Sequence, residues 1–153
     1  MLDLEKLTVE ELALISREAG EECGQRFRRI AQAADPTDLA LQSLLGAMAT
    51  ETELQVLREE ESRPFGAGHR MTPNGMREFI RTSIPSLTKR FGEGTLHRDN
   101  ALFYAESLEE EASRFYRMLA EHAREADARS LFSDLSDRER GKLRYLREVV
   151  LQS

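Results

Sequence analysis

Two segments of the sequence repeat one helical pattern, and this repeat restricts the fold more than any other feature. Residues 106–123, ESLEEEASRFYRMLAEHA, resemble residues 18–34, EAGEECGQRFRRIAQAA. Sliding one segment onto the other pairs Glu21 with Glu109 and superimposes an Arg-Phe dipeptide. In both segments apolar residues recur every three or four positions, which is the period of an amphipathic helix. We therefore expect an internal repeat built from helices.

The same period extends over four segments of the chain. A capping box from Thr8 to Glu11 begins the first segment, and its apolar stripe continues to the ADPTD sequence at residues 34–38. There Asp35 is expected to cap a second helix, with Pro36 in its first turn. The turns within each pair of helices are short, so each pair should form an antiparallel hairpin. The predicted helices cover residues 9–34, 36–62, 100–124 and 127–151, in hairpins 9–62 and 100–151.

A crossover, residues 63–99, joins the two hairpins and contains three prolines and several glycines. We expect short helices in it near residues 74–83 and 86–90. A connection of this length can return the chain along the whole bundle and make the second and third long helices parallel, which is ferritin-like topology. The sequence thus predicts an all-α fold with a single domain, residues 1–153. An apolar cluster in the crossover should cover one end of the bundle or form a dimer surface: Phe79, Ile80, Ile84, Leu87 and Phe91.

Composition narrows the choice of partner and compartment. The net charge of −6 argues against nucleic acid as the main partner. No run of apolar residues approaches the length of a membrane span, and the acidic N-terminus lacks the basic region of a signal peptide. The single cysteine, Cys23, cannot form an internal disulfide. We therefore expect a cytoplasmic protein that binds neither nucleic acid nor membranes.

The second hairpin, through Glu109, Ala112, Tyr116 and the segment 131–146, resembles the rubrerythrin-type branch of the ferritin-like superfamily. In that family each hairpin offers one Glu from its first helix, followed by a small residue and an aromatic residue, and a Glu-x-x-His motif from its second helix. Glu109, Ala112 and Tyr116 match the first-helix pattern. Residues 131–146, LFSDLSDRERGKLRYL, resemble the second-helix segment and put Glu139 at the ligand position.

The resemblance, carried through the repeat, implies a site formed by one glutamate from each long helix: Glu21, Glu51, Glu109 and Glu139. Carboxylates that meet inside a bundle can hold two iron or manganese ions. Both family histidines are replaced, since Leu54 and Lys142 stand at their positions. Shifting the second helix by one residue puts Thr52 and Gln55 there instead, which restores neither ligand. No cofactor is predicted, and iron or manganese would bind only if the site is still competent.

Lys142 suggests a physical reason for the loss of histidine. Buried carboxylates repel one another unless they are protonated or paired with cations. An ammonium group at this position can pair with Glu109 and Glu139 and oppose a dication. Arg28, which stands where the repeat has Tyr116, is expected to supply a second positive charge. The alternative is that Lys142 and the two glutamates of the first hairpin face solvent, as most charged helix residues do.

Two functional classes follow from these residues. The first is a ferritin-like bundle with a degenerate di-iron site that serves as a non-catalytic structural or interaction module, with a homodimer as the expected assembly. The alternative is a metal-binding oxidoreductase that handles iron with oxygen or peroxide through the remaining glutamates. The chain has no Cys-x-x-Cys pair for electron transfer. Any redox partner would therefore be a separate, unknown protein.

Overall fold

The computed structural model describes residues 4–62 and 72–152, and the regular elements in this part of the chain are helices. There are also two single-turn 3-10 helices. The first, η1, precedes the first α-helix, and the second, η2, follows the third α-helix. The predicted all-α class is confirmed. The elements, in chain order, are η1 (Leu4–Lys6), α1 (Val9–Ala33), α2 (Leu39–Ser62), α3 (Pro73–Ser83), η2 (Pro85–Leu87), α4 (Arg98–His122) and α5 (Ala126–Gln152).

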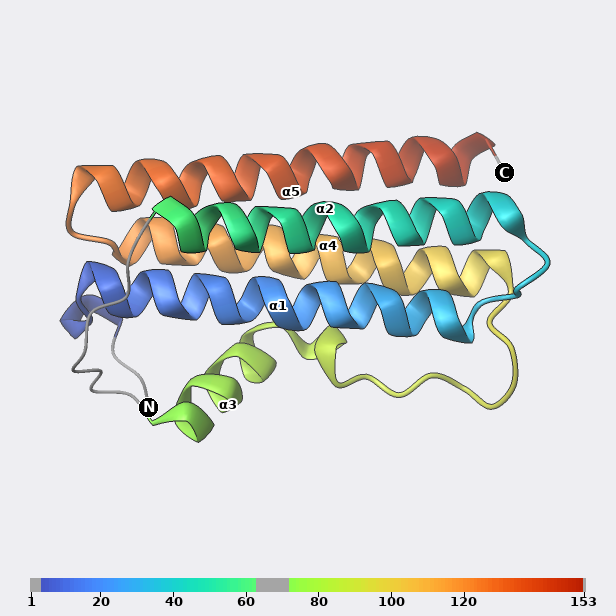
Figure 1. The fold of residues 1–153 in the computed structure, drawn as a ribbon, viewed down its shortest axis with the longest axis horizontal. Coiled ribbons are helices and arrows are strands. Elements are labelled where there is room, and N and C mark those ends of the chain that lie inside the picture. The colour runs from blue at the N-terminus through green and yellow to red at the C-terminus, as the bar shows by residue number, and fades with distance from the viewer. Residues whose placement is uncertain (1–3, 63–71, 153) are drawn as a thin grey trace.

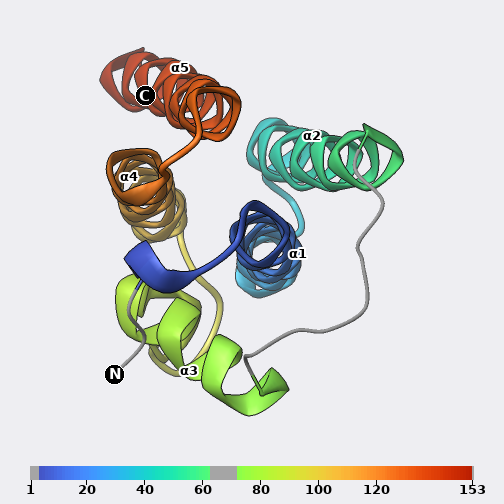
Figure 2. The ribbon, with the colours of Figure 1, turned by 90° about the vertical axis from the view of Figure 1, so that its left-hand side faces the viewer.

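The four long helices form a bundle around one apolar core (Figure 1). Helix α1 packs against α2, helix α4 packs against α5, and the two hairpins meet through α1 and α4. Helices α2 and α4 run in the same direction because the chain between them returns along the length of the bundle (Figure 1). Seen from one end, α3 lies beside α1 and α4 (Figure 2). No described helix is long and apolar enough to cross a membrane.

The start of α1 follows directly from the local sequence. The Thr8 hydroxyl accepts a hydrogen bond from the Glu11 amide at 3.1 Å, and the Glu11 carboxylate accepts one from the Thr8 amide at 3.2 Å. These two bonds satisfy amide groups that have no partner within the helix. The predicted capping box is therefore confirmed.

The predicted start of α2 is wrong by one turn. Asp35 does not cap the helix, because its carboxylate accepts from the Thr37 amide at 2.9 Å within the preceding turn. Asp38 takes the capping role, since its carboxylate accepts from the Leu41 amide at 3.2 Å. An Asp carboxylate can accept a hydrogen bond from the amide two residues later, in a turn, or from the amide three residues later, at the start of a helix. The sequence offered an aspartate for each arrangement, Asp35 and Asp38.

Backbone and side-chain bonds tie the α1–α2 turn to the start of α4. The Leu96 amide donates to the Ala33 carbonyl at 2.7 Å, and the Asp35 amide donates to the Leu96 carbonyl at 3.1 Å. Next to this bridge, the Arg98 guanidinium binds both carboxylate oxygens of Asp38, at 2.6 and 2.9 Å. We call these contacts the turn clamp. They join the two hairpins at one end of the bundle.

The apolar part of the crossover packs on the bundle rather than facing a partner. Ile80, Ile84 and Leu87 are buried in the same core as the long helices, and Phe79 and Phe91 are partly buried against it. They cover the side of α1 and α4 rather than an end of the bundle (Figure 2). Of the two roles predicted for this cluster, the covering role is therefore correct, although its place is different.

Candidate functional site

Charged side chains meet in the middle of the bundle. Glu109 on α4 is completely buried, and Glu139 and Lys142 on α5 are each less than a tenth exposed. The Lys142 ammonium donates to the Glu139 carboxylate at 3.1 Å and to the Thr52 hydroxyl of α2 at 3.4 Å. Cys23 on α1 lies close enough to these three ionisable groups for them to influence its pKa. We call Cys23, Thr52, Glu109, Glu139 and Lys142 the interior cluster, to which each long helix contributes.

Glu109 is the most unusual member of the interior cluster. Neither of its carboxyl oxygens has a hydrogen-bond donor among the described residues, and both are shielded from solvent. Burial raises the pKa of Glu109 well above its usual range, and the charge of Glu139 and a hydrogen bond to that carboxylate raise it further. The shift favours the protonated form, which can donate its proton to Glu139. A buried carboxyl without a cation of its own is thus held neutral.

The same environment keeps Lys142 charged. Burial on its own would lower the pKa of the Lys142 ammonium, but the charge of Glu139 and the hydrogen bond to Glu139 outweigh it and raise that pKa. Burial raises the pKa of the Cys23 thiol, and the charge of Glu139 adds to the shift. Cys23 therefore remains a thiol, the unreactive form of cysteine.

The four predicted glutamates do not all lie in the interior. The Glu21 side chain is 43% exposed and pairs with Arg17 on the same helix at 3.9 Å. Glu51 is exposed, and its charge is only the last of the contributions that raise the pKa of Glu109. The alternative of a solvent-facing position thus holds for Glu21 and Glu51. It fails for Lys142, which is buried.

The position predicted for the second helix is also corrected. Leu54, placed at a family histidine position, is 47% exposed, whereas Thr52 and Gln55 are buried. The shifted alignment that pairs Thr52 with Gln55 therefore describes the inner face of α2. Helix α2 is apolar on several sides near its start, so its sequence alone does not define which face turns inward.

The repeat explains the displacement of Glu21. When α1 and α4 are matched by burial, Gly20 rather than Glu21 pairs with Glu109, and Phe27 pairs with Tyr116. The sequence match paired identical residues, Arg26-Phe27 with Arg114-Phe115, and this pairing is one residue out of step with the burial pattern, although both phenylalanines are buried. The equivalent of Glu109 in the first hairpin is therefore a glycine. A Cβ atom at Gly20 would lie 2.7 Å from Val56 Cγ2 and 3.6 Å from the Tyr116 hydroxyl oxygen.

The two predicted flanking residues behave differently. Tyr116 is buried beside Gly20, as expected for a residue that lines the interior. Arg28 does not turn inward, because it is exposed and binds both oxygens of Glu53 at 2.6 and 2.9 Å. This ion pair links α1 to α2 on the bundle surface. The prediction that Arg28 supplies an interior charge is therefore wrong.

The residues present do not fit a two-metal centre. No group of three or more His, Cys, Asp or Glu side chains in residues 4–62 and 72–152 is arranged to hold a metal ion. His97 lies at the N-terminal end of α4, and His122 lies 3.8 Å from Glu5 near the end of that helix. His69 falls outside the described residues. The ammonium of Lys142 also occupies the space beside Glu139 where a dication would bind, so we derive no step through a metal.

Two members of the interior cluster lie outside the four predicted glutamates: Cys23, which the prediction did not include, and Thr52, which it named only as the shifted alternative in the second helix. Cys23 belongs to the apolar stripe of α1, and this stripe was the signal that it points inward. Thr52 carries a weaker signal because its hydroxyl also bonds the Met48 carbonyl within α2, at 2.9 Å, as buried helical threonines often do. No protein-family model, curated protein or solved structure matched this chain significantly.

Proposed function

We propose that this chain is a ferritin-like bundle that works as a non-catalytic structural or interaction module, in which Lys142 replaces the metal ions of the family. The parallel course of α2 and α4 and the long crossover support the ferritin-like assignment. One buried glutamate on α4 and one on α5 meet in the interior, which supports a common origin of this site and the metal site of the family.

One contact carries this proposal: the hydrogen bond of 3.1 Å between the buried Lys142 ammonium and the buried Glu139 carboxylate. With Glu109 protonated, one cation and one anion remain, so the interior is close to neutral without any ion from solution. The pair lies within α5 and is linked to α2 by the bond from Lys142 to Thr52, but it offers no open coordination position. Such a role is structural.

We further propose that the partner of the module is a second copy of the same chain. Leu54 and Leu57 of α2 point away from the core of the bundle and are 47% and 53% exposed. Because the crossover cluster is used to cover α1 and α4, we choose this outward face of α2, one of the exposed apolar surfaces, as the surface for association. Exposed leucines one turn apart on a helix are typical of helix-to-helix interfaces.

A second candidate is a metal-binding oxidoreductase, and one observation favours it. If Glu109 were ionised, both of its oxygens would be buried without a donor, which is a costly arrangement that a bound cation would relieve. The two candidates differ in what they predict for the purified protein. The module contains no stoichiometric iron or manganese, whereas the oxidoreductase contains it.

The metal content of protein expressed in medium supplemented with iron and manganese tests the proposal. We expect well under one ion per chain. Lys142→His combined with Gln55→His removes the competing cation and adds two imidazoles on inner faces, so metal binding should rise. Lys142→His combined with Leu54→His is the matched control, because Leu54 faces outward and its histidine should add nothing. Stoichiometric metal in the unaltered protein would establish the oxidoreductase instead.

A further inference from the structure

A basic hollow lies on the opposite side of α1 from the interior cluster. Two adjoining cavities of about 400 Å³ each share Arg81 and Thr88 in their walls. Their walls contain six basic residues and two acidic residues, although the whole chain has a net charge of −6. The basic residues are Arg26, Arg29, Arg77, Arg81, Lys89 and Arg90. We call this surface the arginine hollow.

The floor of the arginine hollow is rigid. Arg26 is only 7% exposed, donates to the Lys89 carbonyl and stacks on the Phe91 ring with its guanidinium carbon 4.2 Å from the ring centroid. Phe91 in turn packs edge-on against Tyr104 of α4, with ring centroids 4.9 Å apart. An arginine fixed in this way loses little side-chain entropy when it binds an anion.

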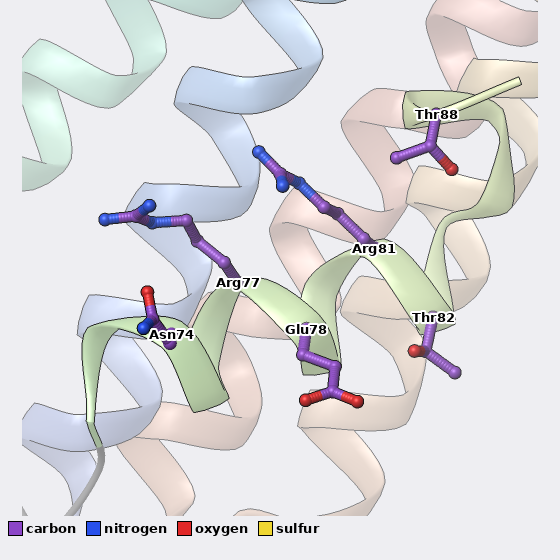
Figure 3. A pocket seen from close by; sticks show the side chains of 6 residues that line it. All are labelled: Asn74, Arg77, Glu78, Arg81, Thr82 and Thr88. Carbon is purple, nitrogen blue, oxygen red and sulfur yellow. The ribbon is translucent and has the colours of Figure 1, made fainter. Parts of the chain in front are cut away.

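Other cations around the hollow have no acidic partner. Arg29 and Arg90 are exposed and form no ion pair within the described residues. Arg77 is exposed as well, and its side chain extends from α3 toward α1, as does that of Arg81 (Figure 3). Glu78, one of the two acidic residues, points away from both arginines (Figure 3).

The second acidic residue neutralises only one arginine. Glu22 accepts from Arg81 at 2.9 Å and holds it against α1. Burial lowers the pKa of Arg26, and the neighbouring charge of Arg29 lowers it further. Guanidinium groups that lie close together repel one another unless an anion binds between them. The planar, forked guanidinium of arginine matches the geometry of phosphate oxygens.

We propose that the arginine hollow is a binding site for a small ligand that carries two or more linked phosphate groups. Two adjoining open depressions of this size suit a small molecule, and the acidic remainder of the chain repels a long polyanion. A lipid surface fits less well, because the apolar face of α3, with Met76 and Ile80, is already buried on the bundle.

Calorimetric titration with inorganic pyrophosphate and tripolyphosphate, at constant ionic strength, tests the proposal. We expect saturable binding at one site. Arg29→Glu combined with Arg90→Glu should weaken it at least tenfold, since both residues face the hollow and neither has a structural partner. Arg138→Glu combined with Arg144→Glu makes the same charge change on exposed positions of α5 and should leave the affinity within about twofold.

Three outcomes would overturn the proposal. The first is the absence of saturable binding by either phosphate probe. The second is an equal loss of affinity in the two double variants, which would indicate attraction by net charge alone. The third is binding of citrate, or of vesicles that contain phosphatidylserine, at least as tight as that of tripolyphosphate and sensitive to the same two arginines. That result would assign the hollow to carboxylates or to lipid headgroups.

Discussion

Lys142 binds Glu139 one helical turn before it on α5, with 3.1 Å between the ammonium nitrogen and the carboxylate oxygen, and both side chains are shielded from solvent. An exposed pair at this spacing contributes little to stability because water screens it. The buried pair behaves differently. Each charge would be strongly destabilising without the other, so the two residues act as one unit.

Lys142→Met should therefore destabilise the protein strongly. Removing one partner of a buried pair typically costs about 3–5 kcal/mol, and we expect the free energy of unfolding in urea to fall by at least about 3 kcal/mol. Arg144→Met is a control on an exposed position of the same helix and should change it by less than about 0.5 kcal/mol. Adding Glu139→Gln to Lys142→Met should recover a large part of the loss, because no unpaired buried charge remains. If both single variants lose the same small amount, Lys142 is not paired in the interior.

The stability of the protein should also depend on pH through Glu109. The pKa of Glu109 is raised on folding, so the folded state holds its proton at pH values where an unfolded glutamate, with a pKa of about 4.3, has lost it. The stabilising contribution is present at low pH and is lost as the pH rises through the folded pKa. Cys23, Glu51, Glu139 and Lys142 are the titratable groups that act on it from the other long helices.

Glu109→Gln isolates this contribution because an amide imitates the protonated carboxyl group. From pH 5 upward the variant should gain stability relative to the unaltered protein, as measured by urea unfolding at each pH. Glu121→Gln makes the same chemical change on an exposed position of α4 and serves as the control. Parallel pH profiles for Glu109→Gln and the unaltered protein would mean that Glu109 ionises normally.

Gly20 should resist substitution although it lies inside a helix. Alanine would gain about 1 kcal/mol from helix propensity. Its Cβ atom would nevertheless stand 2.7 Å from Val56 Cγ2, a branched side chain with little freedom to move, so Gly20→Ala should lower the melting temperature. Gly46→Ala meets nothing within 4 Å and should raise it slightly. Adding Val56→Ala to Gly20→Ala should reduce the loss, and a melting temperature for Gly20→Ala equal to that of Gly46→Ala would contradict the close approach.

The proposed homodimer makes a direct prediction about mass. Light scattering at micromolar concentrations should give twice the 17.5 kDa of one chain. Leu54→Lys combined with Leu57→Lys should halve that mass, because two charges would enter the outward face of α2. Leu39→Lys combined with Leu151→Lys changes leucines that are 76% and 86% exposed near the helix ends and should leave the dimer intact. A mass of one chain for the unaltered protein at every concentration would exclude the dimer.

The sequence predicted the helices well because their apolar periods and the capping box of Thr8 are local signals. It also identified Lys142 correctly as a residue beside Glu139, since residues three apart on a helix share a face. It placed Glu21 and Arg28 wrongly because a match of identical residues between two helices can be shifted by one position from the match of their buried faces, and one residue turns a helix by about 100°. The position of Thr52 depends on contacts between helices, which no single segment encodes.

The turn clamp fixes the axial register of the two hairpins. Cys23 lies as many residues before Ala34 as Glu109 lies after Arg98, which places both groups roughly 17 Å from the clamp along their helices. If one hairpin slid past the other by a single turn, Lys142 would keep Glu139 of its own helix but would lose the Thr52 hydroxyl of α2. The backbone hydrogen bond between Asp35 and Leu96 joins the hairpins at one end of the bundle. It therefore helps to set the interior groups of the two hairpins at the same height along the bundle axis.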